Sequence, residues 1–196
     1  MIGVRVYTRH MSDNPTSADN QQERLLQLSE NELGSYLAGF ADGEGSFNIS
    51  FRKRSDYKEP WKISACFNIS QKEKPILELC QRTFHCGTLR SRPDGIWYFE
   101  VNNLRDLQRY IIPFFTRFGF LSVKKQRDFD IFCELVKVLS HPSHRCEDIV
   151  RLILDLRRDM NDGGKRKYSE TQILAAFAKE SSETTRQTPE AISEMI

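Results

Sequence analysis

The sequence predicts an α+β protein in which helices cover one face of an antiparallel sheet. Three observations lead to this class. A capped helix precedes two runs in which apolar and polar residues alternate. A second helix and a second strand pair follow, and the rest of the chain has the period of helices. The predicted order is therefore α-β-β-α-β-β-α, followed by further helices.

Length and composition favour a single soluble, globular domain. The chain has 196 residues, of which 39% are hydrophobic and 29% are charged. No apolar run approaches the roughly 20 residues that span a bilayer. The start, "MIGVRVYTRH", is too short and too polar for a secretory signal. We expect an intracellular protein, organellar or in a prokaryotic cytoplasm, with a flexible arm over 1–22, a domain over 23–179 and a polar tail over 180–196.

The five cysteines and the charge distribution narrow the class of protein. The cysteine count is odd and no CxxC occurs, so we expect reduced thiols rather than a disulfide framework or a zinc knuckle. "HPSHRC", 141–146, is interpreted as a polar loop between helices. The net charge is +2, but 46–92 holds ten Lys/Arg and four Asp/Glu, or +6, which leaves −4 elsewhere. This basic middle indicates a polyanion partner, with a solvated charged surface as the alternative.

The first helix begins at "SENE", 29–32, which matches a capping box. Its predicted core-facing stripe is Leu33, Tyr36, Leu37, Phe40 and Ala41. Two rows at a spacing of four carry mostly small residues, and they are Gly34, Ala38 and Asp42, and Ser35, Gly39 and Gly43. Small residues at this spacing let another backbone come close. The helix ends on two acids, Asp42 and Glu44, where the helix dipole is already negative, so a cation or partner is expected there.

Two alternating runs, 46–54 and 61–70, predict a hairpin of half-buried strands. The apolar row is Phe47, Ile49, Phe51, Trp61, Ile63, Ala65, Phe67 and Ile69. The opposite row is Ser46, Asn48, Ser50, Arg52, Arg54, Lys62, Ser64, Cys66, Asn68 and Ser70.

A helix over 75–84 and a hairpin over 86–101 that turns at "PDG" complete the predicted sheet. Thr88, Arg90 and Arg92 share one face of the third strand. The fourth strand, 96–101, is apolar on both faces, so its faces cannot be assigned. Helices are then predicted over about 104–118, 125–139, 146–160 and 169–178.

The polar row predicts a nucleic-acid interface. No acid occurs among the assigned positions, and Arg and Asn side chains make bidentate contacts with guanine and adenine. A two-stranded ribbon fits the major groove. The basic loop before the last helix, with Lys165, Arg166 and Lys167, is predicted to hold phosphates. An ordinary solvated surface is the alternative.

"LAGFADGEG", 37–45, resembles the signature of the LAGLIDADG homing endonucleases. The αββαββα order is similar to the core of that family, as is "ISQK", 69–72, and the resemblance covers about 33–177. It implies a saddle-shaped antiparallel sheet plus C-terminal helices, and a site-specific double-strand DNA endonuclease.

The resemblance also implies site residues and cofactors. Glu44 would bind a divalent metal, with the Gly43 carbonyl as a second ligand, and Asp42 would cap or brace the helix end. Mg²⁺ is expected, Mn²⁺ is expected to substitute, and Ca²⁺ is expected to bind without supporting cleavage. Gln71 would position water. A basic residue near the metal would be Lys124 or Lys125, and the sequence leaves that choice open.

One motif supplies one acid, so the resemblance implies a homodimer on a pseudo-palindromic site. The expected interface is Gly34, Ser35, Ala38, Gly39 and Asp42. Three alternatives stand beside this reading: a maturase of the same fold that binds its own intron RNA, a transcription regulator derived from the family, and an unrelated α+β binding module. The intact Glu44 and Gln71 favour cleavage.

Overall fold

The elements of the protein follow the predicted order. The structure, a computed structural model, describes residues 27–53, 61–141, 146–163 and 166–186. The first unit is α2 (Glu30–Glu44), β1 (Gly45–Lys53) and β2 (Trp61–Gln71), and the second is α3 (Lys74–Phe84), β3 (Thr88–Ser91) and β4 (Trp97–Val101). Then follow α4 (Leu104–Asp106), a π-helical turn (Leu107–Ile111), α5 (Ile112–Phe118), α6 (Val123–Leu139), α7 (Glu147–Arg158), a 3-10 turn (Met160–Gly163) and α8 (Glu170–Arg186).

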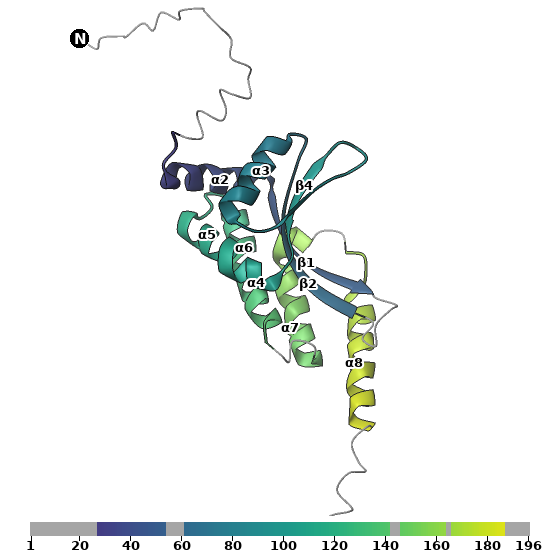
Figure 1. The fold of residues 1–196 in the computed structure, drawn as a ribbon. Helices are drawn as coiled ribbons and strands as arrows, with labels where there is room; N and C mark the ends of the chain where they lie inside the picture. The colour runs from purple at the N-terminus through teal and green to yellow at the C-terminus, as the bar shows by residue number, and fades with distance from the viewer. Residues whose placement is uncertain (1–26, 54–60, 142–145, 164–165, 187–196) are drawn as a thin grey trace, which may run out of the picture.

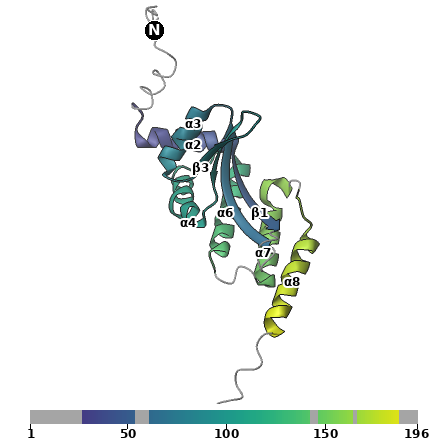
Figure 2. The same ribbon diagram turned by 45° about the vertical axis from the view of Figure 1, so that its right-hand side comes forward.

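The four strands form one antiparallel sheet in the order β1-β2-β4-β3. Helices lie on one face of the sheet, and its other face is open (Figure 1). Figure 2 shows that β1 and β2 bend along their length. The predicted alternation is confirmed, because Phe47, Ile49, Phe51, Phe67 and Ile69 are all buried toward the helices.

Aromatic side chains join the sheet to the helices. The ring of Phe47 lies 5.0 Å from that of Phe67 on the paired strand. It also lies 5.8 Å from Phe115 of α5 and 5.0 Å from Phe132 of α6, measured between centroids. All four rings are at most 1% exposed. Their burial holds β1 and β2 against the helical layer.

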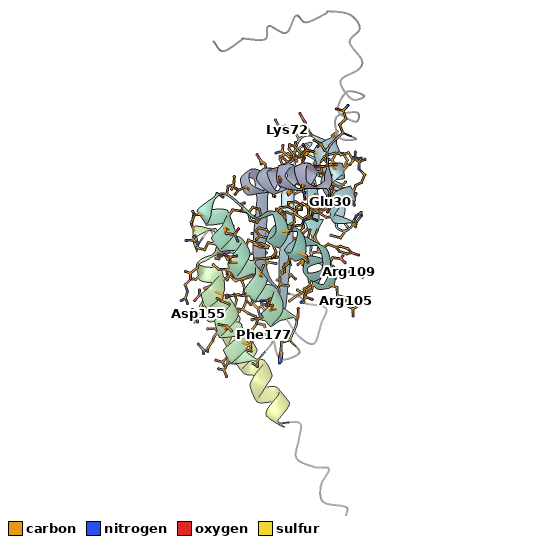
Figure 3. All side chains as sticks on the ribbon, turned by 90° about the vertical axis from the view of Figure 1, so that its left-hand side faces the viewer. Glu30, Lys72, Arg105, Arg109, Asp155 and Phe177 are labelled. Atoms are coloured by element: carbon orange, nitrogen blue, oxygen red, sulfur yellow. The ribbon has the colours of Figure 1, made fainter. Side chains whose placement is uncertain are left out.

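Helix α2 begins at the predicted capping box, in which Ser29 and Glu32 satisfy each other's backbone N–H groups. From the helical side, α2 lies across the top of the layer, and the labelled Glu30 marks its start (Figure 3). The prediction that Tyr36 faces the core is wrong, because its exposed fraction is 52%. The buried face is turned toward the small row and is formed by Gly34, Leu37, Ala38 and Ala41, with Leu33 and Phe40 partly buried beside it.

Only one of the two small rows of α2 remains open. A Cβ at Gly34 would lie 2.1 Å from the ring of Phe118, so this glycine admits α5 rather than a second chain. Ala38 is 3% exposed. The predicted interface positions Gly34 and Ala38 are therefore interior residues. A Cβ at Gly39 or Gly43 would meet nothing within 4 Å, so these two glycines face outward.

The C-terminal part of the chain differs in detail from the prediction. The π-helical turn interrupts the helix predicted over 104–118. Helix α8 continues to Arg186, past the predicted end at 178, and it reaches away from the sheet (Figure 1). Ile173 and Phe177, in the first turns of α8, are buried. All five cysteines are free. Within the described ranges, no helix is both long and apolar enough to cross a membrane.

Candidate active site

The end of α2 runs directly into β1, without an intervening loop residue. Gly45 donates its N–H to the carbonyl of Ala41. The later carbonyls, including that of Gly43, therefore lie past the last intrahelical hydrogen bond. Glu44 is exposed at the same helix end. A carboxylate and a backbone carbonyl are hard oxygen ligands, the kind that Mg²⁺ and Ca²⁺ prefer. The two predicted metal ligands thus lie together and fit the predicted ion.

Asp42, the other acid at this end, binds the beginning of α6. One carboxylate oxygen accepts the N–H groups of Leu121 at 3.1 Å and Ser122 at 3.0 Å, and the other accepts the Ser122 hydroxyl. Burial acts to raise the pKa of Asp42, but these hydrogen bonds and the charge of Lys125 outweigh it, so the pKa lies below its ordinary value. The positive end of α6 stabilises the carboxylate. Asp42 therefore braces two helix ends within one chain.

Lys125, and not Lys124, reaches the junction between α2 and β1. Its Nζ donates to the carbonyl of Gly45, the residue after Glu44. Lys124 instead forms an ion pair with Asp162, and its side chain is 60% exposed. Burial lowers the pKa of the Lys125 ammonium, although the carboxylates of Asp42, Asp128 and Glu44 oppose this. Lys125 is thus a half-buried cation close to Glu44.

Two residues that sequence reasoning missed fix α6 against the outer edge of β1. Asn161 donates from Nδ2 to the carbonyl of Phe47 at 2.9 Å, and its N–H is bonded to Asp128 Oδ1 at 3.1 Å. Asp128 is 4% exposed, the one buried charged side chain among the residues that the structure describes. Asn161 has a φ of 53°, which asparagine tolerates better than most residues. The only signal in the sequence was the turn-forming string "NDGG", 161–164.

Gln71 is the last residue of β2 and is half-buried. In the β1–β2 register, Gly45 lies opposite Ile69. The strands are antiparallel, so β2 continues past the start of β1 to Gln71, at the end of the sheet where Glu44 lies. The register therefore places Gln71 at the same end of the sheet as the candidate metal ligands.

The open face of the sheet carries the predicted polar row in register. Ser46 lies opposite Asn68, Ser50 opposite Ser64, and Arg52 opposite Lys62. Thr88 and Arg90 of β3 extend the row across the sheet. Arg92, just beyond β3, places its guanidinium 4.3 Å from the ring centroid of Tyr98. Arg54 and Lys165 lie outside the described residues.

An acid lies in the middle of this face. Glu100 of β4 is opposite Asn68 on one side and Thr88 on the other. It forms an ion pair with Arg90, and its side chain is 11% exposed. The sequence pattern assigns it no face, because large apolar residues occur on both sides of this strand. Arg90 is consequently held in place by an acid of the same face.

Cys66 and Arg166 differ from their predicted roles. Cys66 was expected to face DNA, but it is only 9% exposed and its thiol donates to Glu100 Oε1 at 3.5 Å. Burial raises the pKa of this thiol to about 12. Arg166 donates from Nη2 to the carbonyls of Arg157 at 2.9 Å and Met160 at 3.1 Å. Arg166 therefore caps the end of α7, a role that the sequence did not predict.

The candidate metal ligands at the end of α2 are few within one chain. Over the ranges that the structure describes, no three His, Cys, Asp or Glu side chains gather to hold a metal ion. A divalent cation at Glu44 would need further ligands from a second chain, a phosphate or water.

An αββαββα core with a polar sheet face and a carboxylate at the end of its first helix defines a narrow class of α+β proteins. The chain belongs to one family of that class, LAGLIDADG endonuclease, whose profile matches residues 37–136. It is 30% identical over 149 residues to "Homing endonuclease I-ApeII" of Aeropyrum pernix, covering 72% of this chain and 88% of that one. It is 28% identical to "DNA endonuclease I-CeuI" of Chlamydomonas moewusii, covering 68% and 66%.

Solved structures share the fold. The archaeal intron-encoded homing endonuclease I-Vdi141I, solved in complex with DNA, gives a TM-score of 0.68 at 24% identity, covering 79% of this chain and 99% of that one. Meganuclease I-SmaMI, bound to uncleavable DNA, gives a TM-score of 0.62 at 26% identity, covering 67% of this chain and 46% of that one. The chain therefore spans about half of I-SmaMI. It spans 31% of "Probable intron-encoded endonuclease 2" of Neurospora crassa, at 29% identity over 70% of this chain.

Proposed function

We propose that the chain is a site-specific endonuclease that hydrolyses phosphodiester bonds in both strands of DNA. One observation carries the proposal: the exposed Glu44 and the half-buried Lys125 lie at the point where α2 passes into the polar face of the sheet. The proposed catalytic residues therefore lie beside the sheet face that is proposed to contact the bases. Relatives named as DNA endonucleases, and a related structure solved with DNA bound, support the same function.

The residues present fit a divalent metal. The Glu44 carboxylate and the Gly43 carbonyl would hold it, and Mg²⁺ suits hard oxygen ligands with several retained waters. Such an ion, when bound, lowers the pKa of an attacking water and stabilises the leaving oxygen. Lys125 would hold positive charge beside the scissile phosphate, and Gln71 would orient the attacking water.

We propose that two copies form the active unit. Each copy would pack through the open row of α2, formed by Ser35, Gly39 and Gly43, with Tyr36 beside it. This contact would bring the two Glu44 carboxylates together, and a two-fold dimer reads a pseudo-palindromic site. Ser35 and Gly39 of the predicted interface remain in this contact, and Gly43 joins them. Asp42 of the predicted interface is left out, because its carboxylate is hydrogen-bonded to the start of α6.

The test compares Glu44→Gln with the wild-type protein on a tiled library of candidate DNA insertion sites. Cleavage should be lost while DNA affinity changes little, because affinity comes mainly from phosphate and base contacts. Glu73→Gln is a matched control: Glu73 is also exposed, and it precedes α3 without a side-chain capping bond. Mg²⁺ or Mn²⁺ should support cutting, and Ca²⁺ only binding.

Near wild-type nicking by Glu44→Gln would rule out the metal-ligand role. A wild-type protein that binds intron RNA but neither binds nor cuts duplex DNA would favour the maturase function instead.

A further inference from the structure

A hollow lined with cations lies where the outer edge of the sheet meets the C-terminal helices. Its volume is about 310 Å³, and it opens between β1, the end of α7 and the segment leading into α8. The polar lining is Ser50, Arg52, Arg157 and Lys167, with Phe51 and Tyr168 as walls. Of the residues that the structure describes, no carboxylate contributes to this lining.

Arg157 is the half-buried cation of this hollow. Its guanidinium lies 5.1 Å from the ring centroid of Phe51, so an aromatic face fixes its position. Its Nε is buried and has no hydrogen-bond partner among the described residues. Buried donors in folded proteins nearly always have an acceptor. Because this Nε is closed to solvent-sized groups, a ligand in the hollow would meet the terminal nitrogens of the guanidinium, and the unmet Nε leaves the group in need of a counter-charge.

The charge around Arg157 points to an anion. Burial lowers the pKa of its guanidinium to about 10, the charge of Arg166 adds to this, and Glu170 opposes it. Glu170 is itself committed, because its two oxygens accept from Arg158 at 3.0 Å and 2.6 Å. Arg52 and Lys167 add exposed positive charge to the rim. An oxyanion would supply a counter-charge to this group.

The position of the hollow identifies which anion. Ser50 and Arg52 belong to the polar row of β1, so the hollow continues the sheet face proposed to meet DNA. β1 is also the outermost strand on that side. We propose that the hollow binds one phosphodiester of the DNA backbone, with Arg157 as its charged donor, which rests on the proposed DNA-binding function. A phosphate contact positions a duplex without reading its sequence.

The test is the salt dependence of binding by the full chain, measured on a target duplex and on an unrelated duplex. Arg157→Gln should weaken binding to both by a similar factor and reduce the slope of log affinity against log salt by about one per contact. Arg151→Gln is the control, because Arg151 lies on the same helix but forms an exposed pair with Glu147. It should leave the slope unchanged. Lys167→Gln should act in the same direction as Arg157→Gln, and it serves if the latter does not fold.

A second measurement locates the phosphate. Single neutral methylphosphonates are placed along the duplex backbone, and one position in each half-site should weaken binding by the wild type but not by Arg157→Gln. An unchanged slope in a folded Arg157→Gln protein would overturn the proposal. The proposal would also be overturned if inorganic phosphate raised the melting temperature of the wild type only, while the salt slopes of DNA binding stayed equal for the two proteins. The hollow would then bind the free ion and not the DNA backbone. A wild type that binds no duplex at all would refute the proposed function itself.

Discussion

The two small rows of α2 should respond in opposite ways to the same substitution. Gly34→Leu introduces a side chain where even a Cβ would lie 2.1 Å from the Phe118 ring. Overpacking of this kind costs about 1 to 3 kcal/mol, and sometimes more. Leucine regains nearly 1 kcal/mol of helix propensity over glycine. With several atoms to place beyond the Cβ, we expect a net loss of about 2 kcal/mol in the free energy of unfolding.

Gly39→Leu should leave the single chain intact and disrupt the proposed dimer. A Cβ at Gly39 meets nothing within 4 Å in one chain, so only the gain in helix propensity remains, up to about 1 kcal/mol. In a two-fold contact the new side chain enters twice, which costs about 2 to 6 kcal/mol per dimer. That is roughly a thirtyfold or greater rise in the dissociation constant of the dimer. Cleavage should fall with it.

Urea denaturation at low protein concentration measures the stability of the single chain, and sedimentation velocity across a concentration series measures the dimer. The reasoning is refuted if Gly39→Leu remains a dimer that cuts DNA. It is equally refuted if Gly34→Leu dissociates the dimer without destabilising the single chain.

Three further substitutions test the contacts of the site. Lys125→Met should lower the cleavage rate by about 100-fold or more with little change in DNA affinity. Lys124→Met, the control, should lower that rate much less. Equal losses of the single-turnover rate in the two variants would mean that the placement of Lys125 is wrong. Asp42→Asn should cost about 1 to 2 kcal/mol of stability at neutral pH. The folded-state pKa of Asp42 is depressed, so this difference should close as the pH falls below about 4, and melting curves that keep it constant would contradict the charge-based account. Glu100→Gln should release Arg90 and alter base preference at one position per half-site, by about 1 to 3 kcal/mol; a uniform loss across a randomised site library would instead mean that the pair serves only stability.

The sheet could be predicted because alternation is a local pattern. In the two long strands apolar and polar residues alternate except at Cys66, and the buried row follows from that alternation. The strand over 97–101 has no such contrast, so Glu100 was left without a face. Helical spacing misplaces Tyr36 because it cannot tell toward which side the buried face turns: the ring of Phe118, from a distant segment, packs over Gly34, and the buried face turns toward Gly34 and Ala38.

The details of the site depend on contacts between distant segments. The choice between Lys124 and Lys125 depends on how α6 packs against β1. Asn161 links Asp128 of α6 to Phe47 of β1, and these three residues are far apart in the sequence. No pattern within either segment encodes the pairing. The candidate metal ligands, in contrast, lie in one short string at 37–45, where the family resemblance assigns them, and that assignment stays a prediction.

The direct passage from α2 into β1 fixes the distance between Glu44 and the polar row. Glu44 is the last residue of the helix, and the polar row begins two residues later at Ser46. Each further position of that row lies about 7 Å along the strand, close to the spacing of two base pairs. The offset between the cut and each base read by β1 would then be set by covalent geometry. A single inserted residue at Gly45 would move the cut relative to the bases and turn the polar row toward the core. Substitutions at the even positions would change which bases are read and leave that offset untouched, so new target sites could evolve without any change in where the strand breaks fall.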